Sequence, residues 1–258
     1  MSRVIVVTSG KGGVGKSSFC ANVGSALAKL NQKVCLIDAD LGLKNLDVIL
    51  GLENRVVYDI EDVIEGRVEL RQALIKDKRC NCLYVLPACK NINVQKVDFS
   101  YLERIIIELN KEFDFIFIDC PAGIERGFYN AINNANEAII VVNLDISSIR
   151  DADKVVGILN SQNINNVSVV VNRVNVEEKD VNKSLSIDDV IDILNIPLIG
   201  IVYYDCLVVS GNNNGIPSVY DEKAYAGKCY NAIARRILGE NVELTKFRKK
   251  SILAKIFN

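Results

Sequence analysis

The 258-residue sequence contains no tryptophan, no histidine, a single methionine and only four prolines. Without histidine, a zinc site would need cysteines alone, and Cys80-Asn81-Cys82 is spaced too tightly for the usual ligand pattern. No run of about 18 to 20 apolar residues is present, so the sequence predicts no membrane-spanning helix. The apolar residues 4–7 are too few for a signal peptide. The net charge of −1 does not fit a polycation that binds nucleic acid over its whole surface.

The composition is that of a cytosolic α/β protein. Hydrophobic residues make up 49% of the chain, which is enough for a large core, and the length is normal for one α/β sheet. Eight cysteines in a chain of this size are typical of reduced and mostly buried thiols. We therefore expect no metal or redox role for them.

Short apolar runs alternate with helical patterns along the whole chain. We predict strands at residues 4–7, 33–37, 83–86, 115–118, 137–142, 168–171 and 198–202. We predict helices at residues 16–30, 99–112, 127–134, 149–160, 186–194 and 224–238, with Ser186 and Asp189 as a weakened capping box. Polar stretches at residues 163–166 and 176–182 are predicted loops. The alternation indicates an α/β, doubly wound and mostly parallel sheet with helices on both faces.

The first predicted strand runs directly into a glycine-rich phosphate-binding loop. The pattern Gly-x4-Gly-Lys-Ser is that of a P-loop, in which backbone N–H groups and a helix N-terminus bind phosphate. We expect Lys16 to reach the β- and γ-phosphates and Ser17 to bind Mg²⁺. A loop that binds a nucleotide without hydrolysing it remains an alternative. The residues expected to contact the nucleotide here are Gly10, Lys11, Gly12, Gly13, Val14, Gly15, Lys16, Ser17 and Ser18. Lys11 is not needed by an ordinary P-loop.

Two further strands end in aspartates. Asp38 and Asp40 follow the second predicted strand, and Asp119 follows the apolar run at residues 115–118 in a Walker-B pattern. Because ligands bind at the carboxyl ends of parallel strands, we expect these side chains beside the phosphates. There they suit water positioning and support of the Mg²⁺ shell. The alternative for a single aspartate after a strand is a helix cap.

Together these residues resemble the MinD/ParA superfamily of ATPases, whose P-loop carries the extra lysine. Within the superfamily, the resemblance is to the MinD family of septum site-determining ATPases of bacteria and some plastids, and it covers essentially the whole chain. The further segments that carry it are residues 42–47, 56–59, 73–79, 119–125 and 147–153, and the basic amphipathic end.

The resemblance implies an ATP hydrolase that uses ATP and Mg²⁺, is slow until a partner stimulates it, and dimerises around two ATP molecules on a membrane. Lys11 would reach the phosphates of the other subunit, so that Lys11, Lys16 and Asp40 form the catalytic set. Asp40 would position the attacking water, and Ser17, Asp38 and Asp119 would serve the metal. Adenine would lie near Asn172, Arg173 and Asp205. A MinC-like division inhibitor and a MinE-like or other topological factor would bind near Asp151 and Asp153.

Two departures from the family pattern concern the nucleotide site. Ser17-Ser18 stand where the family usually has two threonines, which keeps the hydroxyl for Mg²⁺. Tyr203-Tyr204-Asp205 replace a common Pro-Glu-Asp, so the contacts of the base are open at this point, although an aromatic ring can stack on a base.

The last thirteen residues, 246–258, carry five basic residues and no acidic one. Without them the chain keeps 26 of its 31 basic residues against 32 acidic ones. The formal net charge is therefore about −6 for residues 1–245 and +5 for the tail. We predict an ATPase domain at 1–245 and an amphipathic membrane-targeting segment at 246–258, which would place the protein in the cytoplasm at the inner face of the cell membrane, or on the stromal side in a plastid. A helix that packs on the protein's own body is the alternative. The side chains expected to enter an anionic membrane are Phe247, Ile252, Leu253, Ile256 and Phe257.

The function that we infer is placement of the division septum by ATP-driven dimerisation, membrane attachment and recruitment of a division inhibitor, with release on hydrolysis. A ParA-like DNA-partition ATPase would need a basic surface, which the net acidic body lacks, so no nucleic-acid partner is expected. A flagellar-number regulator usually carries an extension before its P-loop, and an iron–sulfur carrier of this fold would need cysteines in glycine-rich settings. Neither feature is found.

Overall fold

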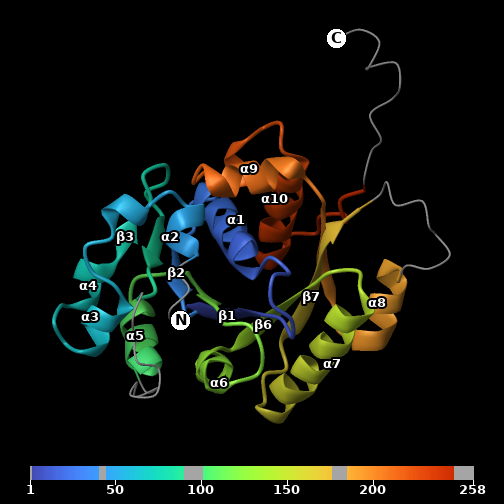
Figure 1. Ribbon diagram of the computed structural model, residues 1–258, viewed down its shortest axis with the longest axis horizontal. Helices are drawn as coiled ribbons and strands as arrows, with labels where there is room; N and C mark the ends of the chain where they lie inside the picture. Colours follow the sequence, from blue (N-terminus) through green and yellow to red (C-terminus); the bar gives the residue numbers. More distant parts are fainter. Residues whose placement is uncertain (1, 41–44, 90–100, 176–184, 247–258) are drawn as a thin grey trace, which may run out of the picture.

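The computed structural model describes residues 2–40, 45–89, 101–175 and 185–246, and an eight-stranded sheet runs through it (Figure 1). The strands lie in the order β3-β4-β2-β5-β1-β6-β7-β8. Their bounds are β1 Arg3–Thr8, β2 Val34–Asp38, β3 Ile75–Lys76, β4 Leu83–Leu86, β5 Phe115–Asp119, β6 Glu137–Val142, β7 Val167–Val174 and β8 Leu198–Tyr203. All neighbours are parallel except the edge strand β3, which runs antiparallel to β4. The predicted fold class is confirmed.

The sheet is buried on both faces, which explains why its strands are continuous apolar runs. Successive side chains of a strand point to opposite faces. In β1, Val4 and Val6 belong to one hydrophobic cluster, whereas Ile5 and Val7 belong to the other. All four side chains are nearly inaccessible to water. Strands covered in this way carry no polar alternation.

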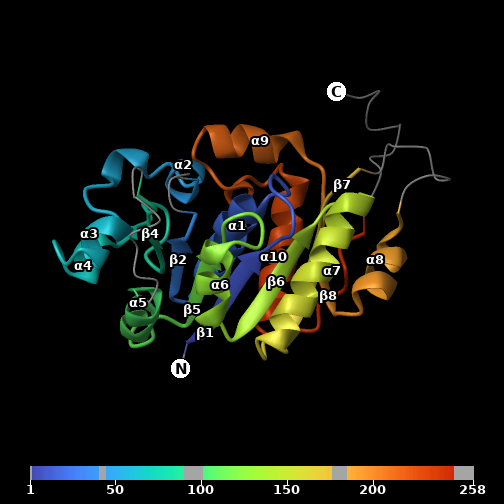
Figure 2. The same ribbon diagram turned by 60° about the horizontal axis from the view of Figure 1, so that its bottom comes forward.

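Helices cover both faces of the sheet (Figure 2). The cluster around Ile5 includes α1 (Lys16–Lys29), α2 (Leu46–Ile49) and α10 (Tyr225–Ile237). The helices on the opposite face are α3 Ile60–Ile64, α4 Leu70–Ala73, α5 Tyr101–Leu109, α6 Arg126–Asn133, α7 Ile146–Ser161 and α8 Ile187–Leu194. A further helix, α9 (Cys206–Asn213), lies against α2 and buries none of its residues fully.

The predicted elements lie within about three residues of their expected bounds wherever the structure describes them. Ser186 caps α8: its hydroxyl accepts from the N–H of Asp189, whose carboxylate accepts from the N–H of Ser186. Residues 163–166 form a loop as predicted, whereas 176–182 fall outside the described residues. The sequence missed β3, α2, α3, α4, α9 and the short 3-10 helices at Glu53–Arg55 and Ser218–Tyr220.

Residues 239–246 follow α10 and form a segment that we call the C-terminal strap. The guanidinium of Arg236 donates to the carbonyls of Val242 (2.8 Å) and Glu243 in the strap, and to that of Ile199 in β8 (2.9 Å). The Tyr225 hydroxyl donates to the carbonyl of Lys246 at 2.5 Å. These bonds fix the strap to the body, while the predicted membrane residues at 247–258 lie outside the described residues.

None of the eight cysteines, which all lie within the described residues, forms a disulfide, and five of them are buried, as expected of thiols that pack in the core. Burial is the main cause that raises the pKa of the Cys120 thiol to about 12. Such a thiol stays protonated and unreactive at neutral pH. In the described part of the chain, no helix is long and apolar enough to cross a bilayer.

Candidate nucleotide-binding site

The phosphate loop lies between β1 and α1, where the sequence places it. Gly13 and Gly15 have φ angles of +77° and +104°, a region that residues with a side chain rarely adopt. Gly15 is the N-cap of α1, so Lys16, Ser17 and Ser18 form the first turn of the helix. The unpaired N–H groups of this turn and the positive end of the helix dipole favour phosphate.

The end of β7 holds the loop from the side. The Asn172 amide donates to the carbonyl of Val14 at 2.7 Å, and the Arg173 guanidinium donates to that of Gly13 at 2.8 Å. A Cβ on Gly15 would come within 2.5 Å of the Asn172 amide nitrogen. Arg173 itself has a φ of +56°, in the left-handed region that is uncommon for a residue with a side chain. The phosphate loop and the end of β7 are therefore in close contact, through hydrogen bonds and through the missing side chain of Gly15.

Asp38 and Asp119 lie side by side at the carboxyl ends of β2 and β5, in register as paired residues. Both are 1% exposed. The Asp38 carboxylate accepts from the backbone N–H groups of Asp40, Asn45 and Leu46 at 3.1–3.2 Å. Within the described ranges, no donor meets hydrogen-bond geometry with either oxygen of Asp119, although the Ser17 hydroxyl and the Cys20 thiol are near enough to lower its pKa.

Burial raises the pKa of both carboxyls, and the charge of Asp119 raises that of Asp38 further. Two buried carboxyls this close do not both ionise readily without a cation. Lys16 opposes the effect on Asp119. An unpaired buried carboxylate beside a second carboxylate and a serine hydroxyl fits a divalent cation. Two carboxylates and a hydroxyl form a small set of oxygen donors, which suits Mg²⁺ because this ion takes few protein ligands together with phosphates and water.

The two lysines of the loop point to different places. Lys16 is buried, and its ammonium donates to the Ser9 hydroxyl, which in turn donates to the carbonyl of Lys11. Lys11 is exposed, and its ammonium donates to Ser147 (2.7 Å) and Asp145 (3.2 Å) at the start of α7. The carboxylate of Asp145 also caps α7 by accepting from the N–H of Ser148. Lys16 therefore serves its own loop, whereas Lys11 connects the loop to α7.

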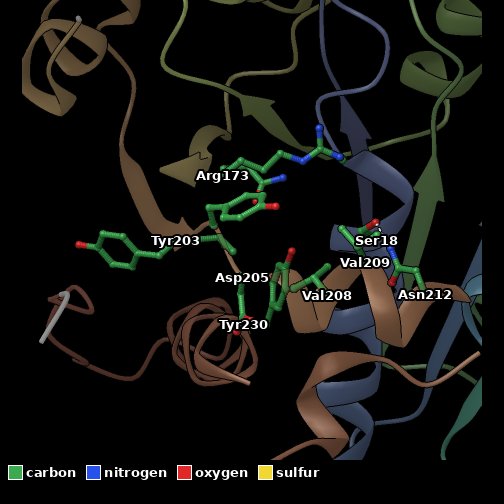
Figure 3. Close-up of a pocket in the computed structure, with 12 residues that line it drawn as sticks. Ser18, Arg173, Tyr203, Asp205, Val208, Val209, Asn212 and Tyr230 are labelled. Carbon is green, nitrogen blue, oxygen red and sulfur yellow. Dashed lines mark hydrogen bonds between the residues drawn. The ribbon is translucent and has the colours of Figure 1, made fainter. Parts of the chain in front are cut away.

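A pocket opens between the end of β7, the end of β8 and α9, beside the phosphate loop (Figure 3). Asn172, Arg173 and Asp205, the residues expected near adenine, all line it. We call it the base pocket after that expectation. Both oxygens of Asp205 accept backbone N–H groups, from Leu207 in α9 and Ala226 in α10, so this side chain orients two helices of the wall. The other lining residues are Gly15, Ser18, Val202, Tyr203, Tyr204, Val208, Val209, Asn212 and Tyr230.

The predicted partner residues Asp151 and Asp153 line an open depression on α7. Asp151 accepts from Lys154 at 3.2 Å, and Asp153 is exposed. A Cβ on Gly10 would overlap the backbone of Asp151, so the phosphate loop packs directly on this part of α7. The depression is thus in contact with the nucleotide site through the loop.

The structure brings together the loop residues, Asp38, Asp119 and the half-buried Asp40, whose pKa is raised by burial and lowered by Lys16. Sequence reasoning missed Ser9, which orients Lys16, and the residues that α9 adds to the base pocket. The signal that could have found α9 is Asp205, a favourable N-cap residue whose carboxylate accepts from the N–H of Leu207.

Comparison with known proteins gives a consistent result. Residues 2–187 match the model of a family described as an AAA domain. A septum site-determining protein MinD of Bacillus subtilis is 46% identical over 260 residues, an alignment that covers 99% of this chain and 97% of the relative.

Solved structures agree with this match. The MinC:MinD cell division protein complex of Aquifex aeolicus superimposes with a TM-score of 0.89 at 47% identity, covering 96% of this chain and all of the other. The septum site-determining protein MinD of Pyrococcus horikoshii, solved with Mg-ADP, gives a TM-score of 0.83 at 29% identity, with 99% of this chain and 98% of the other covered.

Proposed function

The chain belongs to the MinD family of septum site-determining proteins, and we propose that ATP converts it from a monomer into a homodimer that attaches to a membrane. Its role is that of a cell-division ATPase that takes part in septum placement. Dimerisation, membrane attachment and the identity of the partners are the parts of the cycle that we propose here.

The exposed position of Lys11 carries the proposal. Lys16 already fills the inward position of the loop, while the Lys11 ammonium lies at the surface on Asp145 and Ser147. An exposed pair of this kind is weak, with a free energy of about 0 to 1 kcal/mol. The phosphates of a nucleotide bound to a second subunit can therefore replace Asp145 and Ser147 as the partners of the Lys11 ammonium. In that position the lysine completes the nucleotide site of the second subunit.

We assign the hydrolytic residues as follows. Ser17, Asp38 and Asp119 hold Mg²⁺, which, when bound, offsets the negative charge of the phosphates. Lys16 contacts the β- and γ-phosphates, and Asp40 orients the water that attacks the γ-phosphate. Adenine occupies the base pocket beside Asn172 and Arg173. The relative solved with Mg-ADP supports the use of a nucleotide with magnesium.

We assign partner binding to the depression on α7 that Asp151 and Asp153 line. A relative that was solved as a MinC:MinD complex supports a MinC-like division inhibitor as one partner. A MinE-like factor that stimulates hydrolysis is the second. Because Gly10 packs on the backbone of Asp151, a change in the loop reaches this surface directly.

The tail at 246–258 is the proposed anchor, through Phe247, Ile252, Leu253, Ile256 and Phe257. Each basic residue near an anionic surface contributes roughly 1 kcal/mol, and one short amphipathic segment binds weakly. A dimer carries two tails, and the second binds intramolecularly with an avidity gain of about 100-fold or more. The ATP-bound dimer is then peripheral on the inner face of the membrane, and hydrolysis releases it.

The test is sedimentation with anionic liposomes in ATP and in ADP. We expect the full chain to bind with ATP and to stay in solution with ADP. Deletion of residues 246–258 abolishes binding, and Lys11→Ala abolishes both dimerisation and binding while the chain stays folded. Binding that does not depend on ATP contradicts the proposal. ATP-dependent DNA binding at physiological salt, without liposome binding, would favour a partition ATPase instead.

A further inference from the structure

Two adjacent tyrosines stand at the end of β8 beside the base pocket, and they make different contacts. The centre of the Tyr203 ring lies 5.8 Å from that of Tyr225 in α10, and both side chains are partly buried. In Figure 3 the Tyr203 side chain extends away from Ser18 and Asn212. Tyr204 also lines the pocket, but it is 59% exposed. Of the two tyrosines, Tyr204 is therefore the one whose ring a ligand can cover.

The backbone fixes Tyr204 next to the residues that hold the phosphate loop. Its N–H donates at 3.0 Å to the carbonyl of Val174, the last residue of β7, and that strand also carries Asn172 and Arg173. On the other side, the carboxylate of Asp205 accepts from the first turns of α9 and α10. The Tyr204 side chain thus starts from a fixed point on the wall of the pocket.

The charged side chains of the pocket already hold its walls. The Arg173 guanidinium donates to the phosphate loop, and both oxygens of Asp205 accept backbone N–H groups. Among the described lining residues, the exposed apolar side chains are those of Tyr204 and Val209, which are 59% and 55% exposed. A flat, apolar ligand group that covers them removes this surface from water, which is favourable.

A bound nucleotide brings such a group to this place. The N–H groups at the start of a P-loop helix bind phosphates, and the pocket adjoins that helix through Gly15 and Ser18. The nucleoside of a nucleotide whose phosphates lie in the loop can therefore enter the pocket. A purine base is flat, and its π face stacks well on an aromatic side chain.

We propose that Tyr204 is a base-binding residue, whose ring stacks on the purine of the bound nucleotide. The inference rests on the proposed nucleotide site and names the side chain that holds its base. Tyr204 stands where the common Pro-Glu-Asp pattern has glutamate, which offers no ring to a base. Removal of the ring should weaken nucleotide binding about tenfold, as is usual for a base stacked on an aromatic side chain.

The experiment compares two ligands that differ only in the base. Calorimetric Kd values are measured for Mg-ADP and for the magnesium complex of ribose 5-diphosphate, in the wild type, in Tyr204→Phe and in Tyr204→Leu. Phenylalanine keeps the ring, whereas leucine keeps an apolar side chain without a ring. We expect Tyr204→Leu to bind Mg-ADP about tenfold more weakly and Tyr204→Phe to stay close to the wild type. All three proteins should bind ribose 5-diphosphate alike.

Fluorescence gives a signature of the stack itself. The diphosphate of 2-aminopurine riboside replaces ADP, because the emission of 2-aminopurine is quenched when the base stacks on an aromatic ring. With enough protein to bind all of the ligand, the wild type and Tyr204→Phe should quench the emission, and Tyr204→Leu should not. Tyr58→Leu is the matched control, because Tyr58 is an exposed tyrosine outside the pocket, and it should match the wild type in both measurements.

Three results would overturn the proposal. The first is a Tyr204→Leu variant that binds Mg-ADP as tightly as the wild type, and the second is one that still quenches 2-aminopurine. The third is an equal loss of affinity for both diphosphates, which would make Tyr204 a purely structural part of the wall. In each case a wild type that prefers Mg-ADP to ribose 5-diphosphate leaves the base pocket in place, so the two proposals fail separately. A wild type that binds both diphosphates alike would contradict the base pocket itself.

Discussion

Gly15 stands where the phosphate loop turns into α1, with a φ of +104° and with the Asn172 amide nitrogen 2.5 Å from where a Cβ would lie. Both features exclude a side chain, for separate reasons. The backbone angle is strained for any residue with a Cβ, and the Cβ would displace the amide from its bond to Val14. A residue with no side chain thus determines the shape of the phosphate site.

We predict that Gly15→Ala lowers the free energy of unfolding by about 2 kcal/mol and weakens Mg-ADP binding at least tenfold. The matched control is Gly157→Ala in the interior of α7, where an added Cβ meets nothing within 4 Å. Alanine is the better helix former, so this variant should gain about 1 kcal/mol. Urea unfolding and calorimetry measure both effects. Equal behaviour of the two variants would contradict the assignment.

At the scale of elements, α10 connects the core to the C-terminal strap. Its apolar side packs on α1, and its Arg236 binds the strap and β8 through three backbone carbonyls. The adjacent Arg235 contacts only Glu240 among the bonds that the structure gives it, in an exposed ion pair. Adjacent arginines of one helix thus differ sharply in what they support.

Arg236→Ala should destabilise the protein by about 2 kcal/mol, because hydrogen bonds from a charged donor to partly buried carbonyls are lost. Arg235→Ala should cost no more than about 0.5 kcal/mol, as is usual for an exposed ion pair. Amide hydrogen exchange should show faster exchange in residues 240–246 for the first variant alone. If both variants leave that exchange unchanged, Arg236 does not anchor the strap.

Stability of the whole molecule should depend on the carboxyl pair. The pKa values of Asp38 and Asp119 are raised in the folded protein by burial and, for Asp38, by the neighbouring charge. The folded state then holds more protons than the unfolded state above about pH 4, where unfolded aspartate ionises. Stability therefore falls as the pH rises through the raised pKa values.

We predict that, without nucleotide and Mg²⁺, the wild type loses stability between pH 5 and pH 8 relative to Asp38→Asn, which carries one carboxyl fewer. Mg-ADP should remove this difference in pH dependence, since the cation favours the ionised pair of carboxylates in the wild type. Chemical unfolding of both proteins at several pH values, with and without Mg-ADP, measures the effect. Parallel pH profiles for the two proteins without ligand would refute the coupling.

The sequence predicted the parts of the molecule whose pattern is local. Continuous apolar runs identified the seven longer strands, and glycine spacing identified the phosphate loop and the start of α1 at Lys16. The two-residue strand β3 escaped detection because it exists only through its pairing with β4. The helix α9 escaped because it buries no residue fully and so needs no apolar stripe.

The residues of the site were likewise predictable only where they follow from a local pattern. Asp38 and Asp119 were predicted from strand ends, since all parallel strands place their carboxyl ends at one edge. Asn212 was not, because its contact with Ser18 joins residues 194 positions apart, and no spacing in the sequence encodes that contact.

The strand order also decides when a growing chain acquires a nucleotide site during synthesis on the ribosome. β1 is made first, but its neighbours in the sheet are β5 and β6. Arg3 therefore cannot pair with its partner in β5 until Phe115 has been synthesised. At about 5–20 residues per second, translation takes roughly 6–22 seconds to cover that interval. During this interval β1, which leads into the phosphate loop, has no neighbouring strand. The apolar side of α1 is not covered by α10 until that helix is synthesised near the end of translation. A nascent chain of this protein therefore cannot complete its nucleotide site until most of the chain has been synthesised.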